Sequence, residues 1–147
     1  MSPEKYFTKE QQQAIVAAIQ EAEKNTSGEI RLHVDSRSKK DTLDRATEVF
    51  ADLKMHRTAE RNGVLIYLSI EDKKLAILGD AGINAKVPAG FWDCIRNNMV
   101  EKFKAGQITE GICEAIIEAG LQLKQYFPHR KDDKNELPDD ISFGKKE

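Results

Sequence analysis

Residues 62–93 contain the feature that most constrains the fold: two apolar segments joined by a very short polar link. The first segment reads GVLIYLSI at residues 63–70, the link is EDKK, and the second segment, LAILG, ends just before Asp80. A parallel connection needs about a dozen residues or more, so this short link predicts an antiparallel hairpin. The first segment is apolar almost throughout, which is typical of a central strand buried on both faces.

The sequence before the hairpin shows first helical and then strand periodicity. Thr8 and Gln11 form the pattern of a capping box, and apolar residues recur at helical spacing after them, which predicts a helix over residues 8–25. The segment EIRLHVD at residues 29–35 alternates apolar and polar positions, as a strand does. A second helix is predicted at about 42–55, with Leu43 on its apolar face.

Two further helices are predicted after the hairpin, at about 88–104 and 108–126. Pro88 is suited to the first turn of the earlier one, because its missing N–H costs nothing there. We assign residues 1–127 to a single α/β domain. Residues 128–147 form a polar C-terminal tail that we expect to be partly mobile, although apolar residues such as Leu137 can fold back onto the domain.

These elements define the fold class. Their predicted order is α-β-α-β-β-α-α. The first two strands, with a helix between them, form a right-handed parallel crossover, and the hairpin then adds an antiparallel third strand. Helices on both faces of this small mixed β-sheet give a three-layer α/β/α sandwich.

Charge and hydropathy argue against several classes of protein. The net charge is -2 and the pI is near 6.0, so no overall positive field attracts nucleic acid, and we expect no nucleic-acid partner. We see no signal-peptide pattern, and no apolar run approaches the roughly 18 to 20 residues of a transmembrane segment. We therefore expect a cytoplasmic protein in which Cys94 and Cys113 are buried, reduced thiols.

Three carboxylates are predicted to meet at one rim of the sheet. Parallel strands start at the same end, and the antiparallel third strand finishes there, so Glu29 and Asp80 are expected at that end. A short loop ties the next helix to the same rim, with Trp92 and Asp93 near its start. Carboxylates and turn carbonyls are the oxygen ligands that Ca²⁺ and Mg²⁺ prefer. Glu29, Asp80 and Asp93 are therefore candidate ligands of a divalent cation.

Structural roles for the same residues stay open. Asp80 can cap a turn, Asp93 can stabilise a helix N-terminus through the helix dipole, and Glu29 can pair with a nearby arginine. The basic loop at residues 56–61 is a candidate phosphate site, because its side chains can make charge-assisted hydrogen bonds. Trp92 is either an aromatic of the core or its rim, or a platform for a ligand.

Several short motifs occur in an order that resembles the TPM domain family. They are TSGEI at residues 26–30, NGVLIYLS at 62–69, GDAGI at 79–83, FWD at 91–93 and FKAG at 103–106. The resemblance extends from Phe7 to about Asp140, which is nearly the whole chain. It implies a compact, Rossmann-like α/β/α domain.

The resemblance also implies a range of functions. Some members of the family are described as acid phosphatases, and divalent-ion binding, including Ca²⁺, is associated with the fold. Relatives act in photosystem II repair and in the bacterial envelope, often beside LemA-type membrane proteins, which makes such a protein a candidate partner. Glu29 and Asp80 lie inside matching motifs, whereas Asp93 belongs to a narrower subgroup pattern.

Two functional hypotheses follow. In the first, which we favour, the chain is a divalent-cation-binding interaction module, with a role in the envelope or in protein quality maintenance, and a partner docks over Trp92. In the alternative, it is a metal-dependent acid phosphatase that hydrolyses phosphomonoesters, with the metal activating water. The sequence shows no obvious nucleophile for the second reaction, so water must attack directly.

Overall fold

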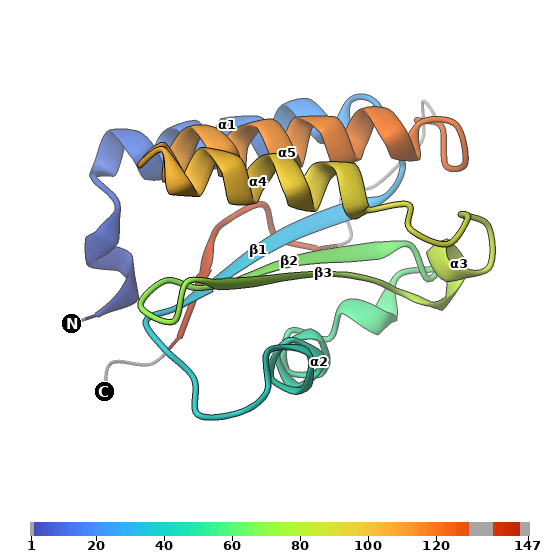
Figure 1. Ribbon diagram of the computed structural model, residues 1–147. Helices are drawn as coiled ribbons and strands as arrows, with labels where there is room; N and C mark the ends of the chain where they lie inside the picture. The colour runs from blue at the N-terminus through green and yellow to red at the C-terminus, as the bar shows by residue number, and fades with distance from the viewer. Residues whose placement is uncertain (1, 130–136, 145–147) are drawn as a thin grey trace.

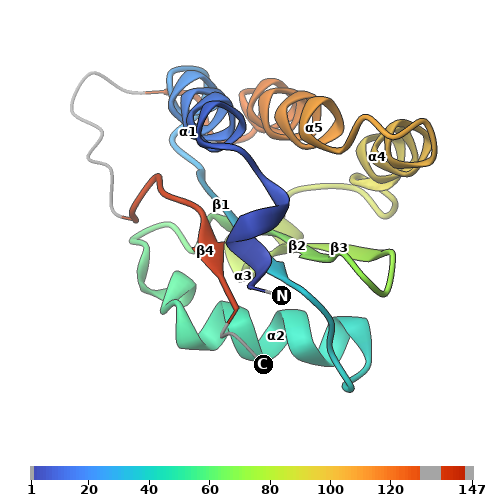
Figure 2. The ribbon, with the colours of Figure 1, turned by 90° about the vertical axis from the view of Figure 1, so that its left-hand side faces the viewer.

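The computed structural model describes residues 2–129 and 137–144. They form three layers, with a four-stranded sheet between two layers of helices (Figure 1). Its elements are, in chain order, η1 (Pro3–Tyr6), α1 (Lys9–Glu23), β1 (Glu29–Asp35), α2 (Thr42–Asp52), η2 (Met55–Arg57), β2 (Gly63–Ser69), β3 (Lys74–Gly79), α3 (Ala81–Asn84), α4 (Asp93–Lys104), α5 (Ile108–Leu123) and β4 (Ser142–Phe143). Helices α1, α4 and α5 cover one face of the sheet and α2 covers the other (Figure 2). The predicted α/β/α sandwich is confirmed.

The sheet has the strand order β3-β2-β1-β4. β1 and β2 pair in parallel, with Glu29 opposite Gly63, and β2 pairs antiparallel with β3. The predicted crossover and hairpin are therefore both correct. Every residue of β2 is buried, as expected of a central strand. In this order β3 forms one edge of the sheet.

Two apolar cores hold the layers together. On the side of α1, α4 and α5, Leu32 and Ile66 are fully buried among residues of those helices. On the side of α2, Leu65 and Tyr67 are fully buried against Val49 and its neighbours. The alternation of side chains along each strand places successive residues in opposite cores.

The helix ends show which local signals were decisive. At the start of α1 the Thr8 hydroxyl accepts from the Gln11 N–H at 3.1 Å, and the Gln11 side chain accepts from the Thr8 N–H at 2.8 Å, so the predicted capping box is present. The helix predicted from residue 88 begins only at Asp93, because Gly90 adopts a positive φ of 75° that no right-handed helix contains. Leu43 is 56% exposed, although we predicted it on the inner face of α2.

The C-terminal segment returns to the sheet. Leu137 is buried in the core beside α2, and Ile141 and Phe143 pack against the opposite core, as their apolar character allows. Ser142–Phe143 then pair in parallel with β1 as a fourth strand, which we did not predict (Figure 2). The other tail residues for which mobility is predicted, 130–136 and 145–147, lie outside the described residues.

The structure also bears on the expectations about a transmembrane helix and about the two cysteines. In the part of the chain that the structure describes, no helix combines the length and apolarity needed to cross a membrane. Both cysteines are free thiols, but Cys94 is exposed and Cys113 is only half-buried. Cys94 is exposed because α4 turns the next residue, Ile95, toward the core instead.

Candidate functional site: a groove along strand β3

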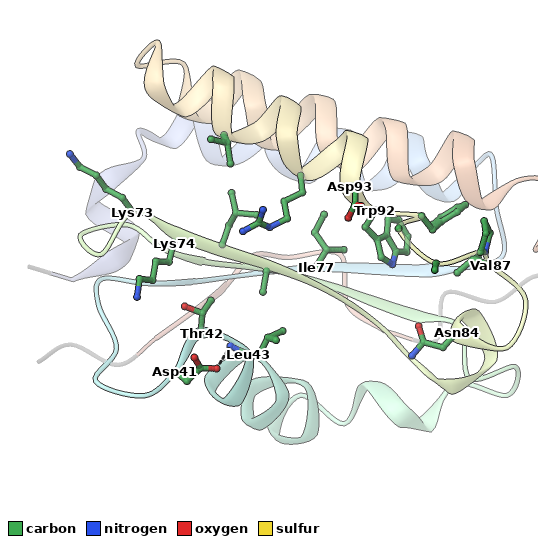
Figure 3. A pocket seen from close by; sticks show the side chains of 18 residues that line it. Asp41, Thr42, Leu43, Lys73, Lys74, Ile77, Asn84, Val87, Trp92 and Asp93 are labelled. Carbon is green, nitrogen blue, oxygen red and sulfur yellow. Dashed lines mark hydrogen bonds between the residues drawn. The ribbon is translucent and has the colours of Figure 1, made fainter.

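A groove with a volume of about 930 Å³ follows the outer edge of β3 (Figure 3). Its floor is the strand itself, residues 73–77, and its walls come from both neighbouring layers. The start of α2, at residues 41–43, forms one wall, while the loop 87–92 and the first turns of α4 form the other. Pockets of roughly 300 to 1,000 Å³ commonly bind ligands, so the groove is large enough to hold several residues of a peptide.

The backbone of β3 directs toward this groove hydrogen-bonding groups for which the described residues provide no backbone partner. The Asp80 N–H donates to the Gly63 carbonyl at 2.9 Å, which fixes the alternation of the antiparallel ladder. The residues at even positions of β3 therefore bond to β2, and Leu75 and Ile77 direct their N–H and C=O groups outward. Gly79 also directs its backbone groups outward, but its carbonyl already accepts a hydrogen bond from the Asn84 side chain at 3.0 Å.

An aromatic cluster builds one wall of the groove. The Phe91 ring lies edge-on to Trp92 with centroids 4.7 Å apart, and edge-on to Tyr126 at 5.6 Å. These contacts fix the ring of Trp92, which is half-buried and lies beside Ile77 in the view of Figure 3. The opposite wall carries Leu43, so the exposed leucine that departs from the predicted face of α2 lines this groove.

Charges are distributed unevenly along the groove. Lys73 and Lys74 lie at the end where β3 begins, and Asp93 lies farther along, beside Trp92 (Figure 3). Asp41 lies near the lysines, but its carboxylate caps α2 by accepting from the N–H groups of Leu43 and Asp44. Among the lining residues at this end, two lysines face one carboxylate, that of Asp41, which leaves a net positive charge, and Asp72 interacts with Lys74 from the turn before β3.

Asp80, the first predicted cation ligand, lies at the end of β3 and is fully engaged by protein groups. Arg61 donates to both of its oxygens, at 2.7 and 2.8 Å, and the Ala81 N–H donates to it at 2.7 Å as the cap of α3. Burial raises the pKa of Asp80, but the hydrogen bonds from Arg61 and Ala81 outweigh this effect and hold the pKa below its usual value. A cation at Asp80 would have to compete with Arg61 for the carboxylate oxygens.

Glu29, the second predicted ligand, is 3% exposed at the start of β1. Glu29 on β1 lies opposite Gly63 on β2, and Gly63 in turn lies opposite Asp80. The backbones of Glu29 and Asp80 are therefore two strand spacings, about 10 Å, apart. A nearer carboxylate is Glu23, whose pKa is raised to about 9 by burial, by a hydrogen bond with Asp139 and by the charges of Asp139 and Glu29.

Asp93, the third predicted ligand, is exposed in the first turn of α4 and belongs to the groove. The structure therefore places the three carboxylates in three different surroundings. Within residues 2–129 and 137–144, no three Asp, Glu, His or Cys side chains come together as a metal site. The described residues do not form a three-carboxylate cation site, and cation binding by this set stays a prediction.

The predicted phosphate loop is only partly available. Arg61 pairs with Asp80, and the buried Thr58 hydroxyl accepts from the Asn62 N–H at 3.1 Å. His56 and Arg57 are exposed. The loop therefore uses two of its polar side chains to hold the ends of β2 and β3.

A buried polar ladder on β1 was not predicted as a unit. His33 lies 2.8 Å from Asp35 through Nε2 and 2.8 Å from the Ser142 hydroxyl through Nδ1. Asp35 also accepts from the Tyr67 hydroxyl at 2.6 Å and from Arg45 Nε at 2.8 Å. The only signal in the sequence was the polar half of the β1 alternation. The ladder fastens β4 to β1, because Ser142 is the residue paired with His33 in the sheet.

Comparisons with known proteins agree with this architecture. Residues 1–121 match the model of the TPM domain family. The NMR structure of the BA42 protein from the psychrophilic bacterium Bizionia argentinensis superposes with a TM-score of 0.91 at 50% sequence identity, covering 96% of this chain and 97% of that one. No curated protein matches the sequence. The chain belongs to the TPM domain family.

A more distant structure shares the fold alone. The N-terminal domain of a protein from P. gingivalis has a TM-score of 0.67 at 16% identity, and the match covers 84% of this chain and 81% of that one. The mixed sheet and its helical layers are therefore compatible with very different sequences.

Proposed function

We propose that this TPM domain protein is an interaction module that binds a segment of a partner protein in the groove along β3. The observation that carries the proposal is the combination of a large groove, a fixed aromatic wall and outward backbone groups at Leu75 and Ile77. The lining also carries the apolar side chains of Leu43, Trp92 and Val100 beside a few polar ones, which is typical of binding pockets.

The biological setting follows from the family resemblance. A LemA-type membrane protein is the candidate partner that the resemblance implies, with a role in the envelope or in protein quality maintenance. A cytoplasmic location stays our expectation for this chain. In that setting the groove would bind a segment of the partner that is exposed to the same compartment.

Peptide selection tests the proposal without knowledge of the natural partner. A random peptide library displayed on phage is selected on the immobilised protein, and enriched peptides are titrated into ¹⁵N-labelled protein. We expect amide shifts centred on residues 73–77 and Trp92. Leu43→Ser should weaken binding about five- to tenfold, because burying part of a leucine contributes about 1 kcal/mol.

The matched control is Leu121→Ser. Leu121 is 48% exposed on α5, outside the groove, so its replacement removes a comparable leucine without touching the site. Binding of the enriched peptides should be unchanged in this variant. Enriched peptides that shift residues elsewhere, or that bind equally well to Leu43→Ser, would contradict the proposal.

Divalent-cation binding is a separate part of the proposed function. A titration with Ca²⁺, with Mg²⁺ as comparator, followed by residue-resolved amide shifts, tests it directly. Because Arg61 already engages Asp80, we expect any saturable response at Glu29 and its neighbour Glu23, and only a weak one at Asp80. A saturable response centred on Asp80 would show that the ion displaces the arginine.

A metal-dependent phosphatase is the alternative, and the resemblance to the TPM domain family is what suggests it. If it is correct, metal-dependent hydrolysis of p-nitrophenyl phosphate should follow the protein peak through purification. Asp80→Asn should then abolish turnover in protein that circular dichroism shows to be folded, a necessary control because the substitution also removes the ion pair with Arg61. Turnover that is unaffected by this substitution would reject Asp80 as part of a catalytic site.

A further inference from the structure

The geometry points to one kind of occupant for the groove: we infer that it binds an extended, mainly apolar peptide, which adds a strand antiparallel to β3 and places an acidic C-terminal end against Lys73 and Lys74. This inference rests on the proposed function, because it specifies what the same groove binds and how.

The first argument is the hydrogen-bonding pattern of the edge. Leu75 and Ile77 each offer one outward N–H and one outward C=O, which an antiparallel peptide can pair with directly. The ladder can extend little further, because the Gly79 carbonyl accepts from Asn84 at one end and the tight turn before Lys74 closes the other. The bound segment therefore pairs over about five residues, at roughly 3.4 Å per residue.

The second argument is the character of the two walls. Side chains of an added strand alternate between the faces of the sheet. Those on the side of α4 meet Trp92 and Val100, and those on the side of α2 meet Leu43. Each wall therefore offers apolar contacts beside its polar residues, so apolar residues are expected on both faces of the peptide.

The third argument is charge. The basic end, Lys73 and Lys74, lies where β3 begins, and an antiparallel strand ends at that point. Arg96 adds a further positive charge to the lining, whereas Asp93 lies beside Trp92, toward the start of the bound peptide. Carboxylates at the C-terminal end and a cation at the N-terminal end of the peptide therefore complement the groove.

The same walls argue against a second copy of this chain. Two copies could join through their β3 edges only if each brought its own α2 and α4 to the junction (Figure 3). These elements already flank the edge on both sides, so they would meet their counterparts before the strands paired. A single strand without attached layers avoids this collision.

The experiment uses the full chain and the peptide KTVLVTVEE with a free C-terminal carboxylate. Saturable amide shifts at residues 73–77 are expected in ¹⁵N spectra. Two variants carry N-methyl groups at alternate backbone positions, one set on the odd and one on the even residues between the charged ends. Methylation of the edge-facing set should weaken binding about tenfold, and methylation of the other set about twofold at most.

Orientation and charge are tested in the same titrations. The reversed peptide EEVTVLVTK and the variant Lys73→Gln/Lys74→Gln should each show binding about fivefold weaker, whereas Lys104→Gln, an exposed lysine outside the groove, should change nothing. Equal effects of the two methylated sets would overturn strand addition, as would a lack of saturable shifts up to about 1 mM. These outcomes concern only how a peptide binds. The proposed function itself would be contradicted if no library peptide bound in the groove.

Discussion

Tyr67→Phe tests whether the buried ladder on β1 stabilises the fold as its geometry indicates. The Tyr67 ring is fully buried, and its hydroxyl donates to Asp35 at 2.6 Å. Asp35 is itself only 4% exposed. Removing the hydroxyl leaves the carboxylate with His33 and Arg45 but without its shortest hydrogen bond.

The expected loss follows from the charge of the acceptor. A hydrogen bond to a charged group contributes about 1.5–3 kcal/mol, and the missing oxygen leaves only a small void. For a domain of this size each kcal/mol lowers the Tm by about 2–4 °C, so the variant should melt roughly 3–12 °C lower. The loss should be present at pH 7 and should persist into mild acid.

The pH dependence has a definite sign. Burial raises the pKa of Asp35, but hydrogen bonds from His33, Arg45 and Tyr67 outweigh it and hold the pKa below its ordinary value of 3.8. The stability that this carboxylate contributes is therefore present above pH 3.8 and is lost as the pH falls toward its folded-state pKa. Because Tyr67→Phe acts on the folded state, where Asp35 stays ionised until the pH falls to its lowered pKa, the loss should be nearly the same at pH 7 and near pH 3.

Urea unfolding followed by circular dichroism, at pH 7 and near pH 3, measures both quantities. Tyr126→Phe is the control, because Tyr126 is only half-buried and lies edge-on to Phe91. We expect this control to stay within about 0.5 kcal/mol of the wild type. A Tyr67→Phe loss as small as that of the control, or one that disappears near pH 3, would refute the account of the ladder.

Two further predictions concern stability elsewhere. The pKa of Glu23 is raised from 4.5 to about 9, so folding keeps this carboxyl protonated, and stability falls as the pH rises through that interval. Glu23→Gln should therefore be about 1–3 kcal/mol more stable than the wild type at pH 8 but not at pH 4, unlike the exposed Glu21→Gln; equal pH profiles would contradict this. Gly82→Ala should lower stability by about 1–3 kcal/mol in thermal unfolding, because a Cβ there meets the carbonyl oxygens of Glu60 and Arg61. An unchanged Tm would show that α3 moves freely to make room.

Local signals in the sequence were sufficient for most of the fold. The short link after residues 63–70 required a hairpin, and the Thr8 capping box marked the start of α1 within a residue. β4 could not be predicted in this way, because a strand of two residues has no periodicity. It is held instead by tertiary contacts such as that between Ser142 and His33.

The candidate site was less accessible to sequence reasoning. Topology correctly placed Asp80 at the end of β3, but the pairing with Arg61 depends on a loop conformation in which Arg61 itself has a positive φ of 53°. The groove was hidden for a different reason, since its walls come from α2, β3 and α4 together. One signal was present: Leu43 lies at the first turn of its helix, where a residue can extend beyond the edge of the sheet.

The central claim is that the outer edge of β3 is open to a partner, and native-state amide hydrogen exchange tests it most directly. In the protein alone, the N–H groups of Leu75 and Ile77 should exchange fast, whereas those of Ala76 and Leu78, bonded to β2, should be strongly protected. Addition of a groove-binding peptide should slow the first pair selectively. Equal protection of all four amides before any peptide is added would show that the edge is already covered, and would contradict the account.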